Sequence, residues 1–302
     1  MCFKLDEDKE RGLYTLYNNK GVYIKVLKSG AELIGLKFIN SSDGLLYRDS
    51  DTGIPAEGWK NHATVLFPVV GRLKNSISKY NNKIIKFTKN HGLARYTEFK
   101  PVKYRLKKEN ASILLEMKSD NETKESYPFD FKFSIMYKIY NKKLKVIFRV
   151  KNLSKEEPLF FSLGWHPGFA VKGKWNLLVK SNIFNYYEVA DNGLLTGKMS
   201  RINKDYFYKL IKSDLKKAVV LGIDDKKKRK IEFNNGKENI ILKFQDFEFL
   251  GIWSEDSNKF ICIEPWQGTD DFVEQKNFNE KLGIVNLKPG AEKKFKVTVK
   301  IK

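Results

Sequence analysis

The 302-residue sequence contains only 2 cysteines, 3 histidines and 8 prolines, and each scarcity narrows the classes of protein to consider. Cys2 and Cys262 provide neither a disulfide framework nor the spacing of a metal-binding motif. No apolar run approaches the roughly 20 residues that a bilayer-spanning helix needs. Residues 1–10 are rich in charge and lack the apolar segment of a signal peptide. We therefore expect a cytoplasmic protein with no membrane partner.

Negative charge is also in short supply, because 57 Lys and Arg residues against 36 Asp and Glu give a formal net charge of +21. Such an excess is typical of proteins that bind nucleic acid. The lysines, however, are spread along the chain and alternate with apolar residues, as in 294–302, where they would form the solvated side of a strand. We interpret the densest cluster, 224–230, as a solvated turn. Since no nucleic-acid-binding signature is present, we expect no nucleic-acid partner.

Helical periodicity is rare, whereas alternation of apolar and polar residues recurs from one end of the chain to the other. The 22 Phe and 14 Tyr residues also favour strands. Only 209–216 has the spacing of a short helix. Many short strands separated by turn signals predict an all-β sandwich or barrel, and the lack of linkers and repeats favours a single domain over 1–302. The clearest predicted strands are 22–27, 131–140, 144–150, 218–222, 240–244 and 294–302.

Two segments in the first third of the chain depart from this strand-and-turn pattern. In 59–72 an apolar run ends at Gly71 and Arg72, where the glycine permits a sharp turn. An exposed arginine at a strand end is the alternative interpretation. In the second segment His91 precedes a glycine and Arg95 follows closely, so that an imidazole and a guanidinium come near each other. The alternative there is an ordinary surface turn.

Two further segments lie in the second half of the chain. His166 is followed by Pro167, which biases the histidine toward an extended backbone and would hold its imidazole in one orientation. A purely structural histidine is the alternative. Glu264 follows the apolar run 260–263, where burial would raise the pKa of its carboxyl toward that of a usable base. A glutamate at the solvated end of a strand is the alternative, and Cys262 is interpreted as a small core residue.

Taken together, these four segments predict a cleft assembled from distant strands, and no P-loop, G-x-S-x-G or H-E-x-x-H motif competes with it. In this order the segments resemble the aldose 1-epimerase (mutarotase) family, in the subgroup similar to the LacX proteins. The resemblance implies a galactose-mutarotase-like β-supersandwich. It also implies interconversion of the α and β anomers of a free hexose, with no metal and no organic cofactor. The matching stretches are 66–72, 91–95, 164–169, 262–268 and a closing 281–290.

The resemblance also implies roles for individual residues. His166 would be the general acid that protonates the ring oxygen, and Glu264 the base that takes the proton of the anomeric hydroxyl. Arg72 and His91 match residues that hold the hydroxyls of the sugar and orient its ring. Arg95 is included among the substrate-binding candidates because it lies close to His91 in the sequence.

The match is incomplete in one respect, because the substrate-binding aspartate of the family has no clear counterpart. Asp214, Asp224 and Asp225 occupy the corresponding third quarter of the chain, but none lies in a supporting motif. Trp253 is a candidate for a face on which a sugar ring stacks, with an ordinary core tryptophan as the alternative.

Two other functions stay open at this stage. Arg72, Arg95 and the excess of lysine suit a phosphate, because guanidinium groups match its geometry, so a hexose-6-phosphate 1-epimerase on the same fold is possible. A non-catalytic carbohydrate-binding protein is the other alternative, although a pure binder needs neither the acid His166 nor the base Glu264. The expected partner is in each case a small-molecule sugar, and the chain is expected to be a monomer or a homodimer.

Overall fold

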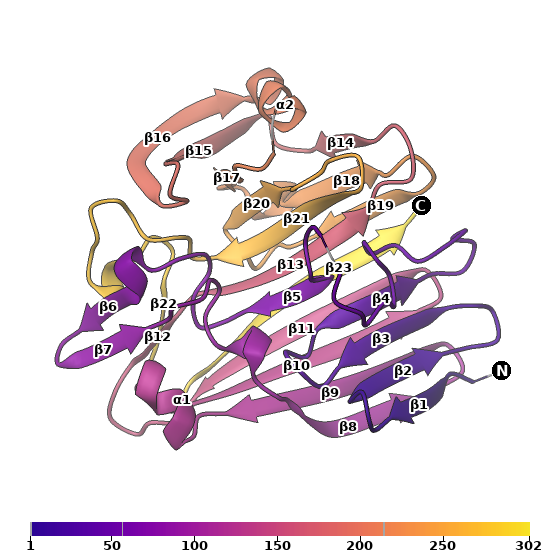
Figure 1. Cartoon of the computed structure of the whole chain (residues 1–302), viewed down its shortest axis with the longest axis horizontal. Coiled ribbons are helices and arrows are strands. Elements are labelled where there is room, and N and C mark those ends of the chain that lie inside the picture. Colours follow the sequence, from indigo (N-terminus) through magenta and orange to yellow (C-terminus); the bar gives the residue numbers. More distant parts are fainter. Residues whose placement is uncertain (1, 56, 214) are drawn as a thin grey trace.

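The computed structural model describes residues 2–55, 57–213 and 215–302, and most of its regular structure is β-strand. The strands form two large antiparallel layers that pack face to face (Figure 1). The prediction of an all-β fold is therefore confirmed. None of the helices in these ranges has the length and apolar character of a membrane span.

The first layer is an eight-stranded sheet in the order β14-β18-β19-β23-β11-β10-β9-β8. Its central strand β11 alternates strictly, with every second residue from Leu144 to Val150 fully buried and the residues between them, Lys145, Ile147 and Arg149, only partly buried. This is the period of two expected of a sheet with one face in the core. The strands are β8 (Lys100–Leu106), β9 (Asn110–Lys118), β10 (Phe131–Tyr140), β11 (Lys143–Asn152), β14 (Asn176–Val179), β18 (Lys230–Asn234), β19 (Asn239–Lys243) and β23 (Glu292–Ile301).

The second layer is a seven-stranded sheet in the order β16-β15-β17-β20-β21-β13-β5. A four-stranded sheet, in the order β1-β2-β3-β4, lies beside it, with β4 close to β5 (Figure 1). The seven strands are β5 (Ala63–Leu66), β13 (Leu163–Ala170), β15 (Ile183–Val189), β16 (Leu195–Asn203), β17 (Val219–Gly222), β20 (Phe249–Trp253) and β21 (Phe260–Gln267). The four are β1 (Lys4–Asp8), β2 (Leu13–Tyr17), β3 (Tyr23–Leu27) and β4 (Leu33–Lys37).

Aromatic side chains join the two layers. Phe67, directly after β5, stacks on Phe133 of β10 with ring centroids 4.5 Å apart, and Phe133 lies 6.5 Å from Phe148 of β11. The buried hydroxyl of Tyr137 in β10 donates a hydrogen bond to the carbonyl of Ala31 between β3 and β4, at 2.7 Å. All of these rings belong to one large cluster of buried residues. Such a shared core is compatible with one domain over 1–302, which stays a prediction.

The helix predicted at 209–216 forms earlier in the chain, as α2 (Lys204–Lys212). Asn203 caps it by accepting a hydrogen bond from the amide of Tyr206 at 2.9 Å, which fixes the earlier start. The six-residue α1 (Asn121–Ser126) is too short to show a helical period in the sequence. The remaining elements are β6 (Ile77–Tyr80), β7 (Lys83–Lys86), β12 (Leu159–Phe161), β22 (Val285–Leu287) and the 3-10 turns Lys74–Ser76, Ala94–Tyr96, Lys226–Lys228 and Phe278–Glu280.

The basic cluster 224–230 does form a solvated turn at Lys226–Lys228, but the interpretation is wrong for Arg229. This side chain is buried, and its Nε donates a hydrogen bond to the carbonyl of Ile223 at 2.7 Å. Its Nη1 donates to the carbonyl of Gln245 at 3.1 Å. The guanidinium therefore binds two loop carbonyls and ties the loop after β17 to the loop after β19.

We expect Leu144→Ala to lower the free energy of unfolding by about 2–5 kcal/mol, because it leaves a cavity in the core. Leu178→Ala is the matched control in the same sheet. It should cost no more than ~0.5 kcal/mol, because the side chain of Leu178 is 49% exposed. Chemical denaturation followed by circular dichroism measures both values. Equal losses in the two variants would contradict the assignment of the buried face.

Candidate active site

The candidate site lies on the face of the seven-stranded sheet that points away from the eight-stranded sheet. Along β21, Ile261 and Ile263 belong to the core between the layers, so the alternation directs Glu264 to the opposite face. Along β13, Trp165 is fully buried in the same core and His166 points outward. Residues adjacent in sequence are thus divided between a structural face and a face with ionisable groups.

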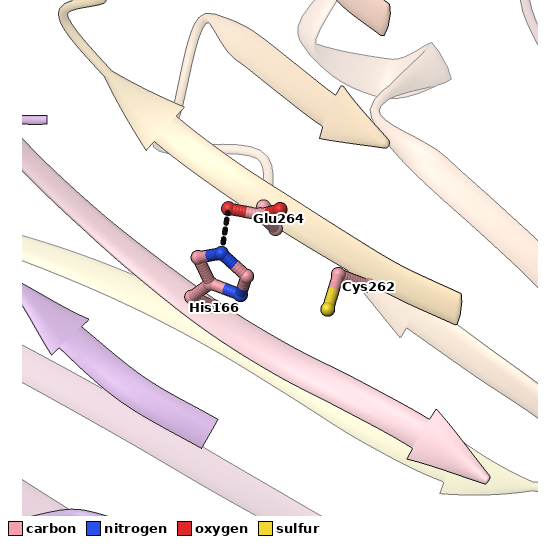
Figure 2. A group of neighbouring side chains, drawn as sticks. All are labelled: His166, Cys262 and Glu264. Carbon is pink, nitrogen blue, oxygen red and sulfur yellow. Dashed lines mark ion pairs between the residues drawn. The ribbon is translucent and has the colours of Figure 1, made fainter. Parts of the chain in front are cut away.

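The register of β13 and β21 brings the two predicted catalytic residues together. Gly164 lies opposite Trp266, which places His166 directly across from Glu264. The Nε2 atom of His166 is 3.2 Å from Oε2 of Glu264 (Figure 2), and their side chains are 9% and 1% exposed. Since β21 continues to Gln267, Glu264 is not at a solvated strand end. The alternative of a glutamate at a solvated strand end is therefore wrong.

Burial is the main influence on both ionisable groups. It raises the pKa of Glu264 well above its ordinary value and lowers the pKa of His166 to about 3. Two features oppose this effect at the carboxyl, because the indole Nε1 of Trp266 donates a hydrogen bond to Oε2 at 3.1 Å and the positive charge of Arg95 lies nearby. Both pKa shifts favour the uncharged forms, the carboxylic acid of Glu264 and the neutral imidazole of His166. The pair is thus suited to exchange one proton between imidazole and carboxyl.

Two indole rings pack directly on backbone that lacks a Cβ. Trp59 stacks on the imidazole of His166, with ring centroids 5.1 Å apart and an interplanar angle of 25°. A Cβ on Gly168 would lie 2.4 Å from this indole. In the same way, a Cβ on Gly251 would lie 2.5 Å from the ring of Trp266. The two glycines therefore allow the indoles to pack against His166 and Glu264.

These groups face a cavity of about 630 Å³, a volume typical of small-molecule sites. Trp253 forms part of the wall, with its ring centroid 5.9 Å from that of His166 and its Nε1 hydrogen-bonded to the carbonyl of Lys216 at 2.9 Å. Arg72 lines the cavity although much of its side chain is exposed. All the residues predicted to form the site line this cavity: Arg72, His91, Arg95, His166, Trp253 and Glu264.

His91 is held in a defined tautomer. Its backbone has a positive φ of 71°, and its Nδ1 accepts a hydrogen bond from the amide of Gly71 at 3.0 Å. Because Nδ1 is the acceptor, the hydrogen of the neutral ring lies on Nε2. Burial also lowers the pKa of His91 well below its ordinary value. The ring of His91 lies edge-on to that of His166, with ring centroids 5.5 Å apart. The site therefore contains, next to His166, a neutral imidazole that can donate a hydrogen bond.

Two of the aspartates considered from the sequence, Asp224 and Asp225, are not at the cavity. Asp224 and Asp225 follow β17 and do not line it. Asp224 accepts a hydrogen bond from the side chain of Asn185 at 2.9 Å, and Asp225 accepts one from the amide of Lys227 at 2.9 Å. Both carboxylates organise a surface loop, so neither is a counterpart of the substrate-binding aspartate. Asp214 lies outside the described residues.

A different aspartate, Asp270, lines the cavity and was missed. Its Oδ1 accepts a hydrogen bond from the amide of Arg72 at 2.8 Å, and burial raises its pKa to about 6. A Cβ on Gly71 would lie 2.0 Å from Oδ1, so only glycine fits there. The available signal was its position shortly after the 262–268 stretch. The expectation of an aspartate in the third quarter of the chain does not cover this position.

Three possible metal-ligand atoms lie close together in the site. One atom each of His166, Cys262 and Glu264 falls within 4.8 Å of the others (Figure 2). Burial, however, raises the pKa of the Cys262 thiol well above its ordinary value, and metals bind the thiolate. The carboxyl is also shifted toward its protonated form. This donor set does not suit a resident metal ion.

Comparisons with known proteins bear on the family and the fold of the chain. The family model described as aldose 1-epimerase matches residues 12–300. The chromosomal LacX protein of Lactococcus lactis subsp. lactis is 26% identical over 304 aligned residues, covering 93% of this chain and 97% of that protein.

Two solved structures extend the comparison. A galactose mutarotase related enzyme from Lactobacillus acidophilus has a TM-score of 0.80 at 26% identity, covering 96% of this chain and 97% of its own. A galactose mutarotase-like protein from Clostridium acetobutylicum has a TM-score of 0.81 at 19% identity, covering 99% and 98%, and shows the fold alone. The predicted galactose-mutarotase-like β-supersandwich is confirmed.

We expect the purified protein to contain no stoichiometric zinc, because the Cys262 thiol is held in its protonated form. Metal analysis by mass spectrometry tests this, and dialysis against EDTA should leave the thermal unfolding temperature unchanged. Cys2→Ala, at an exposed cysteine, serves as the control for Cys262→Ala. Tightly bound zinc that disappears only in the Cys262 variant would contradict the expectation.

Proposed function

The chain belongs to the aldose 1-epimerase family, and from this premise we propose that it is an isomerase that interconverts the α and β anomers of a hexose. The observation that carries the proposal is the buried contact of His166 Nε2 with Glu264 Oε2, at 3.2 Å, beside a cavity of about 630 Å³. One group of this pair can give a proton while the other takes one. General acid–base catalysis of ring opening needs both abilities at one anomeric centre.

The proposed reaction uses His166 as the imidazolium and Glu264 as the carboxylate. Because burial favours the uncharged pair, the proton of Glu264 first passes to Nε2 of His166 across the 3.2 Å contact. His166 protonates the ring oxygen as the bond between that oxygen and C1 breaks. Glu264 takes the proton of the anomeric hydroxyl as its oxygen becomes the aldehyde carbonyl. Rotation about C1–C2 presents the other face of the aldehyde, and reclosure returns both protons. The cycle leaves the protein and the proton balance unchanged.

The environment of the pair supports this exchange. Ring opening converts a charged pair, imidazolium and carboxylate, into an uncharged pair, imidazole and carboxylic acid. Burial of both His166 and Glu264 favours the uncharged form, whereas direct contact of opposite charges stabilises the charged one. The two forms are thereby brought closer in free energy, which lowers the cost of moving the proton in either direction.

The other cavity residues fit roles in holding the sugar. His91 supplies a neutral N–H, and Arg72 and Arg95 supply guanidinium donors for hydroxyl oxygens. Trp59 and Trp253 present aromatic surface near the imidazole, suited to the apolar C–H face of a pyranose. The wall thus combines a few directed polar groups with apolar surface, as small-molecule sites commonly do.

A phosphorylated hexose is a second candidate substrate, favoured by one observation. Four cationic residues line the cavity, namely Arg72, Arg95, Lys216 and Lys217. Guanidinium groups bind phosphate oxygens in a matched geometry. The chemistry at the anomeric carbon would be the same, because the phosphate would be held away from the acid and the base.

Polarimetry of freshly dissolved α-D-glucose and α-D-galactose tests the proposal directly. We expect the protein to accelerate the approach to the equilibrium rotation. His166→Ala and Glu264→Gln should each lose about 10²–10⁴-fold in kcat, the range of a general acid or base.

Glu255→Gln, at an exposed glutamate outside this cavity wall, is the matched control and should keep the wild-type rate. Near-wild-type rates in both the His166 and Glu264 variants would contradict the mechanism. Acceleration with glucose 6-phosphate alone would select the second candidate. Binding without acceleration on any of these sugars would make the chain a carbohydrate-binding protein.

The charge of Arg95 should set the pH range of activity. Its positive charge lowers the pKa of both His166 and Glu264, so Arg95→Gln should raise both. The acid limb of the pH profile of kcat marks the gain of a further proton by the pair, and the basic limb marks loss of the proton that it exchanges. Both limbs should therefore move to higher pH in Arg95→Gln. Arg95→Lys keeps the charge and should leave them in place. Unmoved limbs in the glutamine variant would contradict this influence.

A further inference from the structure

Asp270 is a cavity carboxylate whose hydrogen-bonding capacity is largely unused. Its Oδ1 accepts one hydrogen bond, from the amide of Arg72 at 2.8 Å. Among the described residues, no side chain forms an ion pair or a hydrogen bond with this carboxylate. A carboxylate has about four acceptor positions, and one set below the surface is costly to leave without donors. The cavity is therefore the side from which further donors can come.

The segment that carries Asp270 is fixed in place by its neighbour. Asp271 forms an ion pair with Lys281, and both side chains are only 2% exposed. The other oxygen of Asp271 accepts a hydrogen bond from the amide of Lys74 at 2.9 Å. Removing either partner of such a buried pair is strongly destabilising. Asp270 is thus held rigidly at the end of β21, three residues beyond the last residue of the strand, Gln267.

Gly71 completes this arrangement from the opposite side. Its φ of 68° is in the left-handed region, and a Cβ there would lie 2.0 Å from Oδ1 of Asp270. In the same turn, the amide of Arg72 donates a hydrogen bond to Asp270 and the amide of Gly71 donates one to Nδ1 of His91. The turn therefore fixes the positions of both Asp270 and His91.

We propose that Asp270 determines sugar specificity by accepting a hydrogen bond from one ring hydroxyl of the substrate. The inference rests on the proposed function. Asp191, in the third quarter of the chain, also lines the cavity, but its side chain is fully exposed and pairs with Lys217 at 3.3 Å, so Asp270 is the better-placed acceptor. A hydroxyl fits better than a phosphate, because a carboxylate repels an anion. The guanidinium of Arg72 also lines the cavity and can donate a hydrogen bond to a neighbouring hydroxyl. The two residues together would then bind a pair of vicinal hydroxyls.

The test compares wild type with Asp270→Asn on the best hexose substrate and on its 2-, 3-, 4- and 6-deoxy derivatives. In the variant, the amide oxygen can still accept from the Arg72 amide, but the atom facing the cavity becomes a donor. We expect wild type to lose about 10–100-fold in kcat/KM on one deoxy sugar, the effect of one hydrogen bond to a charged group. Asp270→Asn should lose a similar factor in kcat/KM on the parent hexose, mainly through a higher KM. On that one deoxy sugar the variant and wild type should have the same kcat/KM, because the hydroxyl that Asp270 binds is already missing.

Asp224→Asn, at a carboxylate remote from the cavity wall, is the matched control and should behave as wild type. An equal loss on the parent and on every deoxy sugar would overturn the proposal, because it would mean that Asp270 acts only by holding the turn. A collapse of kcat at unchanged KM would overturn it as well, since it would assign Asp270 to the chemistry.

Failure of the proposed function has a different signature. If wild type turns over none of these sugars, equilibrium binding of the same series, measured by calorimetry, replaces the rates. A loss of affinity that depends on one hydroxyl in wild type and is absent in Asp270→Asn would still support the role of Asp270. Identical affinity profiles in the two proteins would overturn it, whatever the outcome of polarimetry.

Discussion

Two ionisable side chains, His166 and Glu264, are buried in contact on one face of a sheet, and the rest of the site is arranged around them. Burying either group alone would be costly. The cost falls because the two lie opposite each other in neighbouring strands and can share a proton. The indole of Trp266 supplies a further hydrogen bond to the carboxyl. A one-residue slip of the strand register would send these groups to the other face, so the site depends on the register.

The two-layer architecture keeps that register fixed. The inner face of the seven-stranded sheet packs on the eight-stranded sheet through aromatic residues such as Phe67 and Phe133. The outer face is therefore free to carry polar chemistry without being the source of stability. Glycines at positions 168 and 251 let indole rings lie against the strands, which a side chain at either position would prevent. The core between the two sheets supports the strands, and the indole rings pack against their outer face, so both define the shape of the cavity.

The large positive charge has a structural distribution that fits a solvated surface. In β11 the lysines and the arginine alternate with fully buried residues, as the sequence pattern predicts. Arg229 is the exception, because its guanidinium bonds to buried loop carbonyls. At the cavity the cationic residues stand beside the acidic groups Glu264 and Asp270. The charge of Arg95 lowers the pKa of both His166 and Glu264, while most of the excess positive charge faces water.

The sequence by itself determined the strands, because alternation is a local property, and the extended backbone of His166, because Pro167 constrains it. Sequence patterns and the resemblance to the family together identified six residues that line one cavity. Only the tertiary structure decided which carboxylate joins them. Asp270 reaches the cavity through contacts with Gly71 and Arg72, some 198 positions earlier in the chain. Such long-range packing leaves no periodic trace in a sequence, whereas burial and turn preference do.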